Sequence, residues 1–273
     1  MLGSPRACRR GCDDGPSRAR RALPSVRPVQ CAVLSKAEKF TIGVETSAGG
    51  FSAGWCFELP GCYALAAPGQ DIRARMVLAI LEYAAWSHLR QAERLSLDVE
   101  QVRVVETIET RADLRAGDSL AFFAHDAEAP TGREFPAWAN PHDLALDELR
   151  KLAAAAPREM IDHQLDAEGR TIRGILQHVG EMEFFYARQL APGIPEKSRP
   201  VLTEPPFREL QDVHILLQQV VCGAPPNTVV RRDTVDALGP ETWSVRKAMR
   251  RSTWHVRYHT WEARRSIGSL WLA

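Results

Sequence analysis

Long apolar runs are missing from this sequence of 273 residues. A helix that spans a membrane needs about 18 or more consecutive apolar residues, and no stretch of the chain approaches that length. The N-terminal region also lacks the apolar segment of a secretory signal. These absences exclude a membrane-spanning protein, so we expect no membrane partner, a reducing compartment and a cytoplasmic location.

Closely paired cysteines are absent as well. None of the six cysteines forms the C-x-x-C spacing of a zinc ribbon. Disulfides are rare in reducing compartments. We therefore predict six free thiols, at Cys8, Cys12, Cys31, Cys56, Cys62 and Cys222.

The chain has little net charge, +1 at pH 7, but that charge is unevenly distributed. Residues 1–37 hold eight Lys and Arg against two Asp, a net charge of +6, so the remainder of the chain carries −5. A phosphate backbone repels a folded body of that sign. We therefore do not expect nucleic acid as the principal partner, although the basic tail points weakly the other way.

Residues 1–37 are rich in Arg, Pro, Ser and Gly and show no apolar periodicity. Such a composition does not support a packed core. We interpret the segment as a disordered basic tail. Two alternatives remain open: an upstream sequence outside the natural product, with translation beginning near Val33, and an organelle transit peptide.

Residues 38–125 show the pattern of a small α+β domain, an antiparallel sheet with one main helix. Two β-rich runs, "KFTIGVET" and "GFSAGWCFE", are joined by a turn and predict a hairpin. The run "YALA" predicts a third strand, and residues 71–91 have the apolar spacing of a helix. The runs "VRVVETIET" (102–110) and "SLAFFAHD" (119–126) are candidates for further strands.

Within that domain, the stretch "ELPGCYALAAPGQDIRARMVLAILEYAAW" resembles the HicB-like domains of toxin–antitoxin systems. In these domains a strand ends in a Leu-Pro-Gly-Cys turn and a helix follows the next strand. The resemblance implies that fold, and a small RNA-cleaving toxin as the partner of members that act as antitoxins. Many members carry a separate DNA-binding segment, and none is evident here. A small module that only packs against its neighbour is the alternative.

Residues 126–140 gather Pro and Gly without an apolar period, and we predict a linker between domains there. Residues 141–273 then show four helical patterns, which together predict an all-α four-helix bundle. The four runs are "HDLALDELRKLAAAAPREMIDHQL", which Pro157 is expected to interrupt, "TIRGILQHVGEMEFFYARQL", "PFRELQDVHILLQQVV" and "ETWSVRKAMRRSTWHVRYHTWEARRSIGSL".

Two histidines four positions apart, His255 and His259, lie in the last predicted helix. Residues at i and i+4 share one face of a helix, and both rings can reach one ion about 2 Å from each nitrogen. His178 lies on the apolar line of the second helix, so it too can face the core. A lone histidine there is usually a hydrogen-bonded core residue, but the pair favours a metal site.

The second and fourth of these helical runs resemble the corresponding helices of the DinB-like superfamily. That family comprises metal-binding four-helix bundles that include thiol-dependent S-transferases and a maleylpyruvate isomerase. It takes one histidine from the second helix and an H-x-x-x-H pair from the fourth. The resemblance therefore implies that His178, His255 and His259 bind a divalent metal ion, such as Zn, Ni or Fe.

Three imidazoles leave a divalent ion at least one open coordination position, which is typical of catalytic sites. A thiol bound there would lose its proton more easily. We predict a metal-dependent thiol S-transferase or isomerase that acts on a low-molecular-weight thiol, an electrophile or another small substrate. The alternative is a non-catalytic regulatory or partner-binding protein with a HicB-like antitoxin-type module and a structural metal. A homodimer is compatible with both, and no catalytic residue is assigned.

The other ionisable side chains are interpreted as structural or solvated. Helical spacing sends Glu181 and Glu183 to other faces than His178, so we expect solvated acids there and no base. The remaining histidines lack a partner at ligand spacing and are expected at the surface or at helix ends: His88, His125, His142, His163 and His214. A solvated basic face is expected on the last helix, with anion binding as the alternative, at Arg246, Lys247, Arg250, Arg251, Arg264 and Arg265.

Overall fold

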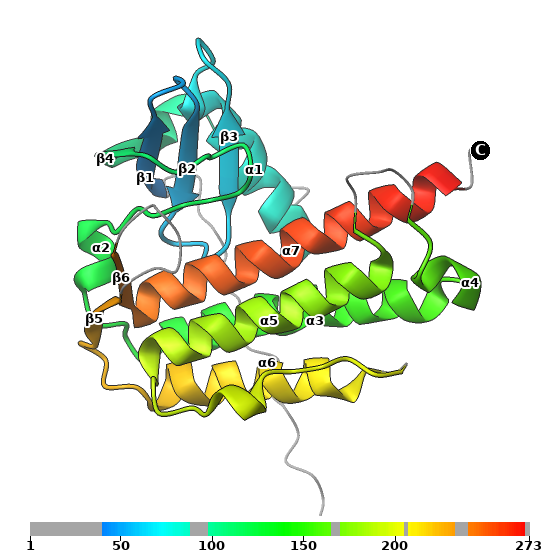
Figure 1. The fold of residues 1–273 in the computed structure, drawn as a ribbon. Helices are drawn as coiled ribbons and strands as arrows, with labels where there is room; N and C mark the ends of the chain where they lie inside the picture. The colour runs from blue at the N-terminus through cyan, green and yellow to red at the C-terminus, as the bar shows by residue number, and fades with distance from the viewer. Residues whose placement is uncertain (1–39, 88–97, 165–169, 205–206, 233–239, 271–273) are drawn as a thin grey trace, which may run out of the picture. The chain divides into compact units, whose positions relative to one another are not determined.

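A four-stranded mixed sheet and one helix form the N-terminal part of the fold (Figure 1). The computed structural model describes residues 40–87, 98–164, 170–204, 207–232 and 240–270. All of these belong to the second of the two units into which the chain divides, Leu34–Ala273. The predicted tail, residues 1–37, lies outside the described residues.

The sheet has the strand order β3-β2-β1-β4. Its strands are β1 (Phe40–Ser47), β2 (Ser52–Cys56), β3 (Tyr63–Ala66) and β4 (Val102–Thr110). The pairs β1–β2 and β2–β3 are antiparallel, as predicted, but β4 pairs with β1 in parallel. The expectation of a purely antiparallel sheet is therefore wrong at this edge. The chain crosses over through a helix between β3 and β4, and such a crossover allows a parallel pairing that a tight hairpin cannot make.

The helix of this part, α1 (Ile72–Ser87), buries Met76, Ile80 and Tyr83 in the core of the sheet. Gly54 in β2 lets α1 approach closely, because a Cβ atom at this position would lie 2.7 Å from Cγ of Met76. The predicted helix is thus confirmed over residues 72–87, and its predicted end at residue 91 lies outside the described residues.

The run 119–126, a candidate strand by its sequence, is not one. It is extended without strand pairing and then turns into the short helix α2 (Ala124–Ala127). The buried carboxylate of Glu45 accepts hydrogen bonds from the backbone nitrogens of Leu120 and Ala121 and from Oγ of Ser119. One side chain therefore satisfies the donors that a neighbouring strand would otherwise satisfy.

The second part is mainly helical, and α7 packs against both α3 and α5 while α5 packs against α6. A two-stranded antiparallel hairpin precedes α7, and the sequence did not predict it. The elements are α3 (Glu134–Ala155), α4 (Arg158–Ile161), α5 (Ile172–Leu190), α6 (Arg208–Gly223), β5 (Val229–Arg232), β6 (Glu241–Ser244) and α7 (Val245–Leu270). Two short 3-10 helices complete the described fold: η2 (Val99–Gln101) and η3 (Glu196–Ser198).

Helix α3 begins seven residues before the predicted start at Pro141, inside the predicted linker of residues 126–140. Pro136 is the third residue of α3, in the first turn, where a backbone N–H has no acceptor within the helix. Trp138 and His142 are both fully buried, and their packing stabilises the helix through Pro141. Helix α3 ends at Ala155, before Pro157, as expected.

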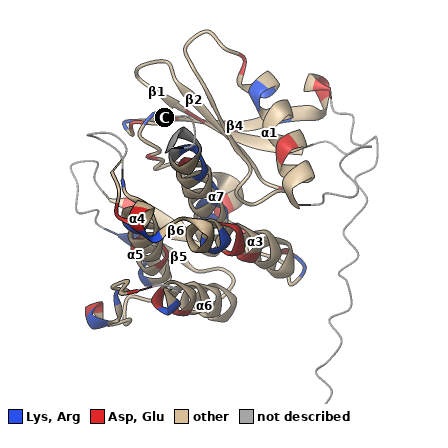
Figure 2. Ribbon diagram, turned by 90° about the vertical axis from the view of Figure 1, so that its right-hand side faces the viewer, with Lys and Arg blue, Asp and Glu red and all other residues tan. Residues whose placement is uncertain are grey.

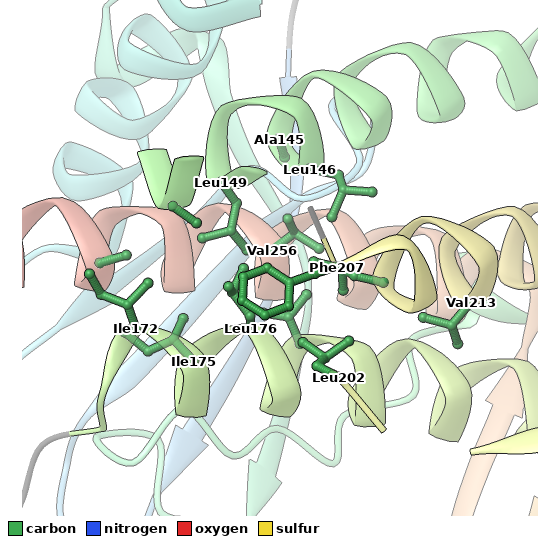
Figure 3. Close-up of a cluster of buried hydrophobic side chains, with 14 of the residues drawn as sticks. Ala145, Leu146, Leu149, Ile172, Ile175, Leu176, Leu202, Phe207, Val213 and Val256 are labelled. Carbon is green, nitrogen blue, oxygen red and sulfur yellow. The ribbon is translucent and has the colours of Figure 1, made fainter. Parts of the chain in front are cut away.

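Apolar side chains of these helices, together with two from the loop before α6, form a continuous core (Figure 3). Its central members are Leu149 of α3, Ile175 and Leu176 of α5, Leu210 of α6 and Val256 of α7, each 0% exposed. The spacing of Ile175 and Leu176 in the sequence predicted this stripe on α5. No helix in the described ranges combines the length and apolarity needed to cross a membrane.

The basic residues of α7 (Figure 2) do not form one solvated face. Lys247, Arg250 and Arg251 are between 0% and 8% exposed, whereas Arg264 and Arg265 are exposed as expected. The prediction of a solvated face is wrong for Lys247, Arg250 and Arg251, because α7 packs against the segment that follows β4. There Lys247 Nζ donates to the carbonyl of residue 120 at 3.1 Å, and the Arg250 guanidinium donates to that of residue 121 at 2.7 Å.

Three cysteines lie in the described residues, and each is a free thiol, as predicted. Cys56 and Cys62 are buried and Cys222 is exposed. Cys8, Cys12 and Cys31 lie outside the described residues.

Candidate metal centres

Helices α5 and α7 bring together the three histidines that the sequence singled out. Thr171 precedes the first residue of α5 and caps the helix: its Oγ1 accepts a hydrogen bond from the nitrogen of Gly174 at 2.9 Å. His178 lies on α5, and His255 and His259 lie on consecutive turns of α7. Because α5 packs against α7 (Figure 1), segments far apart in the sequence contribute to one cluster.

The Nε2 atoms of these imidazoles converge. His255 Nε2 lies 3.1 Å from His178 Nε2 and 3.1 Å from His259 Nε2. The ring centroids are 4.4 to 4.9 Å apart. His255 and His259 are 5% and 4% exposed, whereas His178 is half-buried. The cluster is therefore closed on the side of α7 and more open at His178.

A carboxylate fixes the orientation of one ring. Glu262 Oε2 lies 2.5 Å from His259 Nδ1, so a neutral His259 that donates its Nδ1 proton to Glu262 has its lone pair on Nε2. Burial alone would raise the pKa of Glu262, but the hydrogen bond from His259 lowers it. This pairing of a carboxylate with the outer nitrogen of a histidine is common behind metal-binding imidazoles.

Burial and neighbouring positive charge keep two of the imidazoles neutral. Burial lowers the pKa of His178 to about 4, and the charges of His259 and Arg170 act in the same direction. Burial, followed by the charges of His259 and His178, lowers the pKa of His255 well below its usual range. Neutral rings at pH 7 have a free lone pair, which metal binding requires.

The residues fit a metal ion. Two ligand atoms at about 2.0–2.1 Å from one ion are roughly 2.9–3.4 Å apart for angles between octahedral and tetrahedral, and the two separations of 3.1 Å lie in that range. The outer nitrogen of His255, Nδ1, is buried and has no hydrogen-bond partner among the described residues, so this ring lacks the outer contact that Glu262 gives His259. Without an ion, each of these two contacts needs a proton between its nitrogens, and His255 Nε2 takes part in both.

A second cluster of potential ligands was missed from the sequence. His142, Glu183 and His214 are 0%, 0% and 1% exposed and lie together among α3, α5 and α6. The expectations of a solvated Glu183 and of surface positions for His142 and His214 are therefore wrong. Each residue lies on the buried stripe of its helix. His142 follows Trp138 by four residues and His214 follows Leu210 by four, and projecting all three helices would have shown this.

Two further histidines within the described ranges take no part in either cluster. His163 is exposed, as expected. His125 is half-buried in α2, where it stacks on Phe57, and its Nε2 accepts a hydrogen bond from Nη1 of Arg246 at 2.7 Å. His88 lies outside the described residues. Comparison with protein-family models, with curated proteins and with solved structures found no match to this chain.

Proposed function

We propose that the helical part of this chain is a DinB-like four-helix bundle of α3, α5, α6 and α7 in which His178, His255 and His259 hold a divalent metal ion. The proposed activity is transfer of a low-molecular-weight thiol to an electrophile, or isomerisation of a small substrate. The proposal rests on one observation above the others: His255 Nε2 lies 3.1 Å from Nε2 of both His178 and His259.

Each side chain has a defined part in this proposal. The histidines supply neutral nitrogen ligands, and Glu262 orients His259 by accepting its Nδ1 proton. A divalent ion at this site would promote deprotonation of a thiol or water that binds to it. Arg170, exposed just before α5, adds positive charge beside His178 and would attract an anionic thiol or substrate.

In the same proposal, residues 38–125 form a HicB-like domain. The Leu-Pro-Gly-Cys turn lies between β2 and β3, and α1 follows β3, as that resemblance implies. Its role beside the helical part would be structural, because Gly61 of this turn approaches Thr253 and Trp254 of α7 closely.

A second candidate is a regulatory or partner-binding protein in which the ion only braces the helices. The burial of His255 and His259, at 5% and 4% exposure, favours it, since a substrate needs access to the ion. The partial exposure of His178 favours the enzyme.

Metal content tests the site. We expect the purified His255→Ala variant to contain about one equivalent of metal less than the unmodified protein, because two ligands do not retain the ion. The matched control is His163→Ala, which removes an exposed imidazole outside the cluster and is expected to leave metal content unchanged. Equal metal in the His255→Ala and unmodified proteins would remove the basis of the proposal.

Thiol consumption separates the enzyme from the bracing site. The metal-loaded protein is incubated with a panel of low-molecular-weight thiols and an α,β-unsaturated electrophile, and free thiol is measured over time. The transferase predicts faster loss than with His255→Ala. The same rate with both proteins, at normal metal content of the unmodified protein, supports the bracing role and contradicts the transferase.

A further inference from the structure

Three helices converge on the cluster of His142, Glu183 and His214. Glu183 of α5 lies between the two imidazoles, with its Oε1 atom 2.9 Å from His142 Nε2 of α3 and 3.0 Å from His214 Nδ1 of α6. The rings of His142 and His214 have centroids 4.2 Å apart. One ligand atom from each residue lies within 4.8 Å of the other two.

The imidazole of His142 is not explained by hydrogen bonding. Its Nε2 atom makes an ion-pair contact with Glu183 Oε1 at 2.9 Å, but neither ring nitrogen makes a well-aligned hydrogen bond in the described part of the chain. The ring is 0% exposed and stacks on Trp138. A fully buried imidazole without well-aligned hydrogen bonds costs free energy. If His142 Nε2 instead binds an ion, its lone pair is directed at the ion. The oxygen of a neighbouring ligand then lies to one side of the lone-pair direction.

The outer nitrogen of His214 has the partner that a metal-binding imidazole usually has. His214 Nε2 lies 2.9 Å from Asp143 Oδ1, and the amide of Gln218 donates to the same oxygen at 2.7 Å. This leaves Nδ1 of His214 directed at Glu183. A carboxylate behind the outer nitrogen fixes both the tautomer and the orientation of a ligand ring.

We propose that His142, Glu183 and His214 hold a second divalent ion that ties α3, α5 and α6 together. Two imidazoles and one carboxylate form a common zinc ligand set, and this set suits zinc better than magnesium or calcium. The near-complete burial of all three residues leaves no access for a substrate. The site is independent of the proposed function, since it shares no ligand with the histidines of α7.

The alternative is a cluster held by a shared proton. A protonated His214 between Glu183 and Asp143 would form a buried ion-pair network without metal. That network uses the same contacts of His214 but leaves the contact of His142 Nε2 with Glu183 without good hydrogen-bond alignment, which the metal would explain.

Zinc content of four proteins tests the proposal: the unmodified chain, His255→Ala, His142→Phe and the double variant, each dialysed against zinc and then against buffer. We expect about two, one, one and zero equivalents. Phenylalanine keeps the stacking on Trp138 while it removes the ligand nitrogen. Glu181→Gln, two residues before Glu183 on the same helix, is the control and is expected to keep both ions. Circular dichroism reports whether each variant is folded.

Failure of the two sites gives different results. If only the site of α7 fails, His255→Ala contains as much zinc as the unmodified chain and His142→Phe contains none. If the second site fails, His142→Phe keeps the zinc of the unmodified chain, which overturns the proposal. Where His142→Phe does not fold, the His255→Ala protein decides alone: about one retained equivalent supports the second site, and a folded, zinc-free protein overturns it.

Discussion

Arg250 of α7 binds Asp126 of α2 through two nitrogens of its guanidinium, with Nε 2.9 Å from Oδ1 and Nη2 2.8 Å from Oδ2. The side chains are 5% and 0% exposed. The ring centroids of Trp55 and Phe123 lie 4.7 and 5.1 Å from the central carbon of the same guanidinium. This buried pair therefore connects α7, which carries two of the clustered histidines, to the segment after the sheet.

Removal of one partner of this pair is expected to destabilise the fold strongly. Asp126→Ala leaves the Arg250 charge buried and unpaired, and breaking a buried ion pair in this way costs about 3–5 kcal/mol. Urea unfolding measures the change. Glu128→Ala, which removes a carboxylate with 66% side-chain exposure two residues away, is the control and should change stability by less than about 0.5 kcal/mol. Similar losses in both variants would contradict the role given to the pair.

Gly61, in the turn between β2 and β3, is expected to tolerate no side chain. Its φ is +89°, and an added Cβ would lie 2.6 Å from Cβ of Thr253 and 2.9 Å from the backbone nitrogen of Trp254. Gly61→Ala therefore combines left-handed strain of about 1–2 kcal/mol with a clash of roughly 1–3 kcal/mol.

The matched control is Gly69→Ala. Gly69 has a φ of +82°, but a Cβ there meets no atom within 4 Å. Only the left-handed strain applies, so thermal unfolding should show a clearly smaller decrease in Tm than for Gly61→Ala. Equal decreases would mean that α7 does not press against the turn.

Local patterns predicted the helices well, because each helix carries its own apolar stripe. The run 171–190 predicted α5 to within one residue, and Thr171 was a sound candidate for its cap. The pairing of β4 with β1 and the hairpin of β5 and β6 were not predictable in this way, since they depend on which strands meet in space. Likewise Lys247 and Arg250 were predicted to be solvated, because their acidic partners, Glu241 and Asp126, lie outside α7 and only the fold shows the contacts.

The two histidine clusters differ in the same respect. His255 and His259 were recognisable because a single helix places both on one face. His142 and His214 stand alone in their helices, and their common partner Glu183 belongs to a third. No spacing within one segment reveals such a cluster. The only local signal of this cluster is an acidic residue, Glu183, on the apolar stripe of its helix. Without the fold, that signal does not show which residues are its partners.

Glu262 is expected to strengthen metal binding at the proposed site on α7 without binding the ion itself. Glu262→Gln removes the charge behind His259 Nδ1 but keeps a hydrogen-bond acceptor there. Loss of such an outer partner typically weakens metal affinity about 10–100-fold. Competition with a chromogenic chelator measures the affinity. Glu159→Gln, an exposed carboxylate on α4, should bind as the unmodified protein does, and unchanged affinity in Glu262→Gln would exclude this role.

Lys247 should make the stability of the fold depend on pH above neutrality. Burial lowers the pKa of Lys247 from an ordinary 10.5 to about 8, against the opposing effect of Glu241, at 2.7 Å. The folded chain thus releases this proton at a lower pH than the unfolded chain does. Stability linked to Lys247 is therefore lowest below pH 8 and rises as the pH increases from 8 towards 10.5.

Urea unfolding between pH 8 and 9.5 tests this dependence against Lys247→Met, whose side chain does not titrate. We expect the free energy of unfolding of the unmodified protein to rise relative to the variant by on the order of 1–2 kcal/mol over this range. Comparing how the free energy of unfolding changes with pH in the two proteins removes the contribution of other groups. One such group is Cys56, whose burial raises its pKa and so lowers stability as the pH rises. Parallel profiles for the two proteins would show that Lys247 is not desolvated in the folded chain.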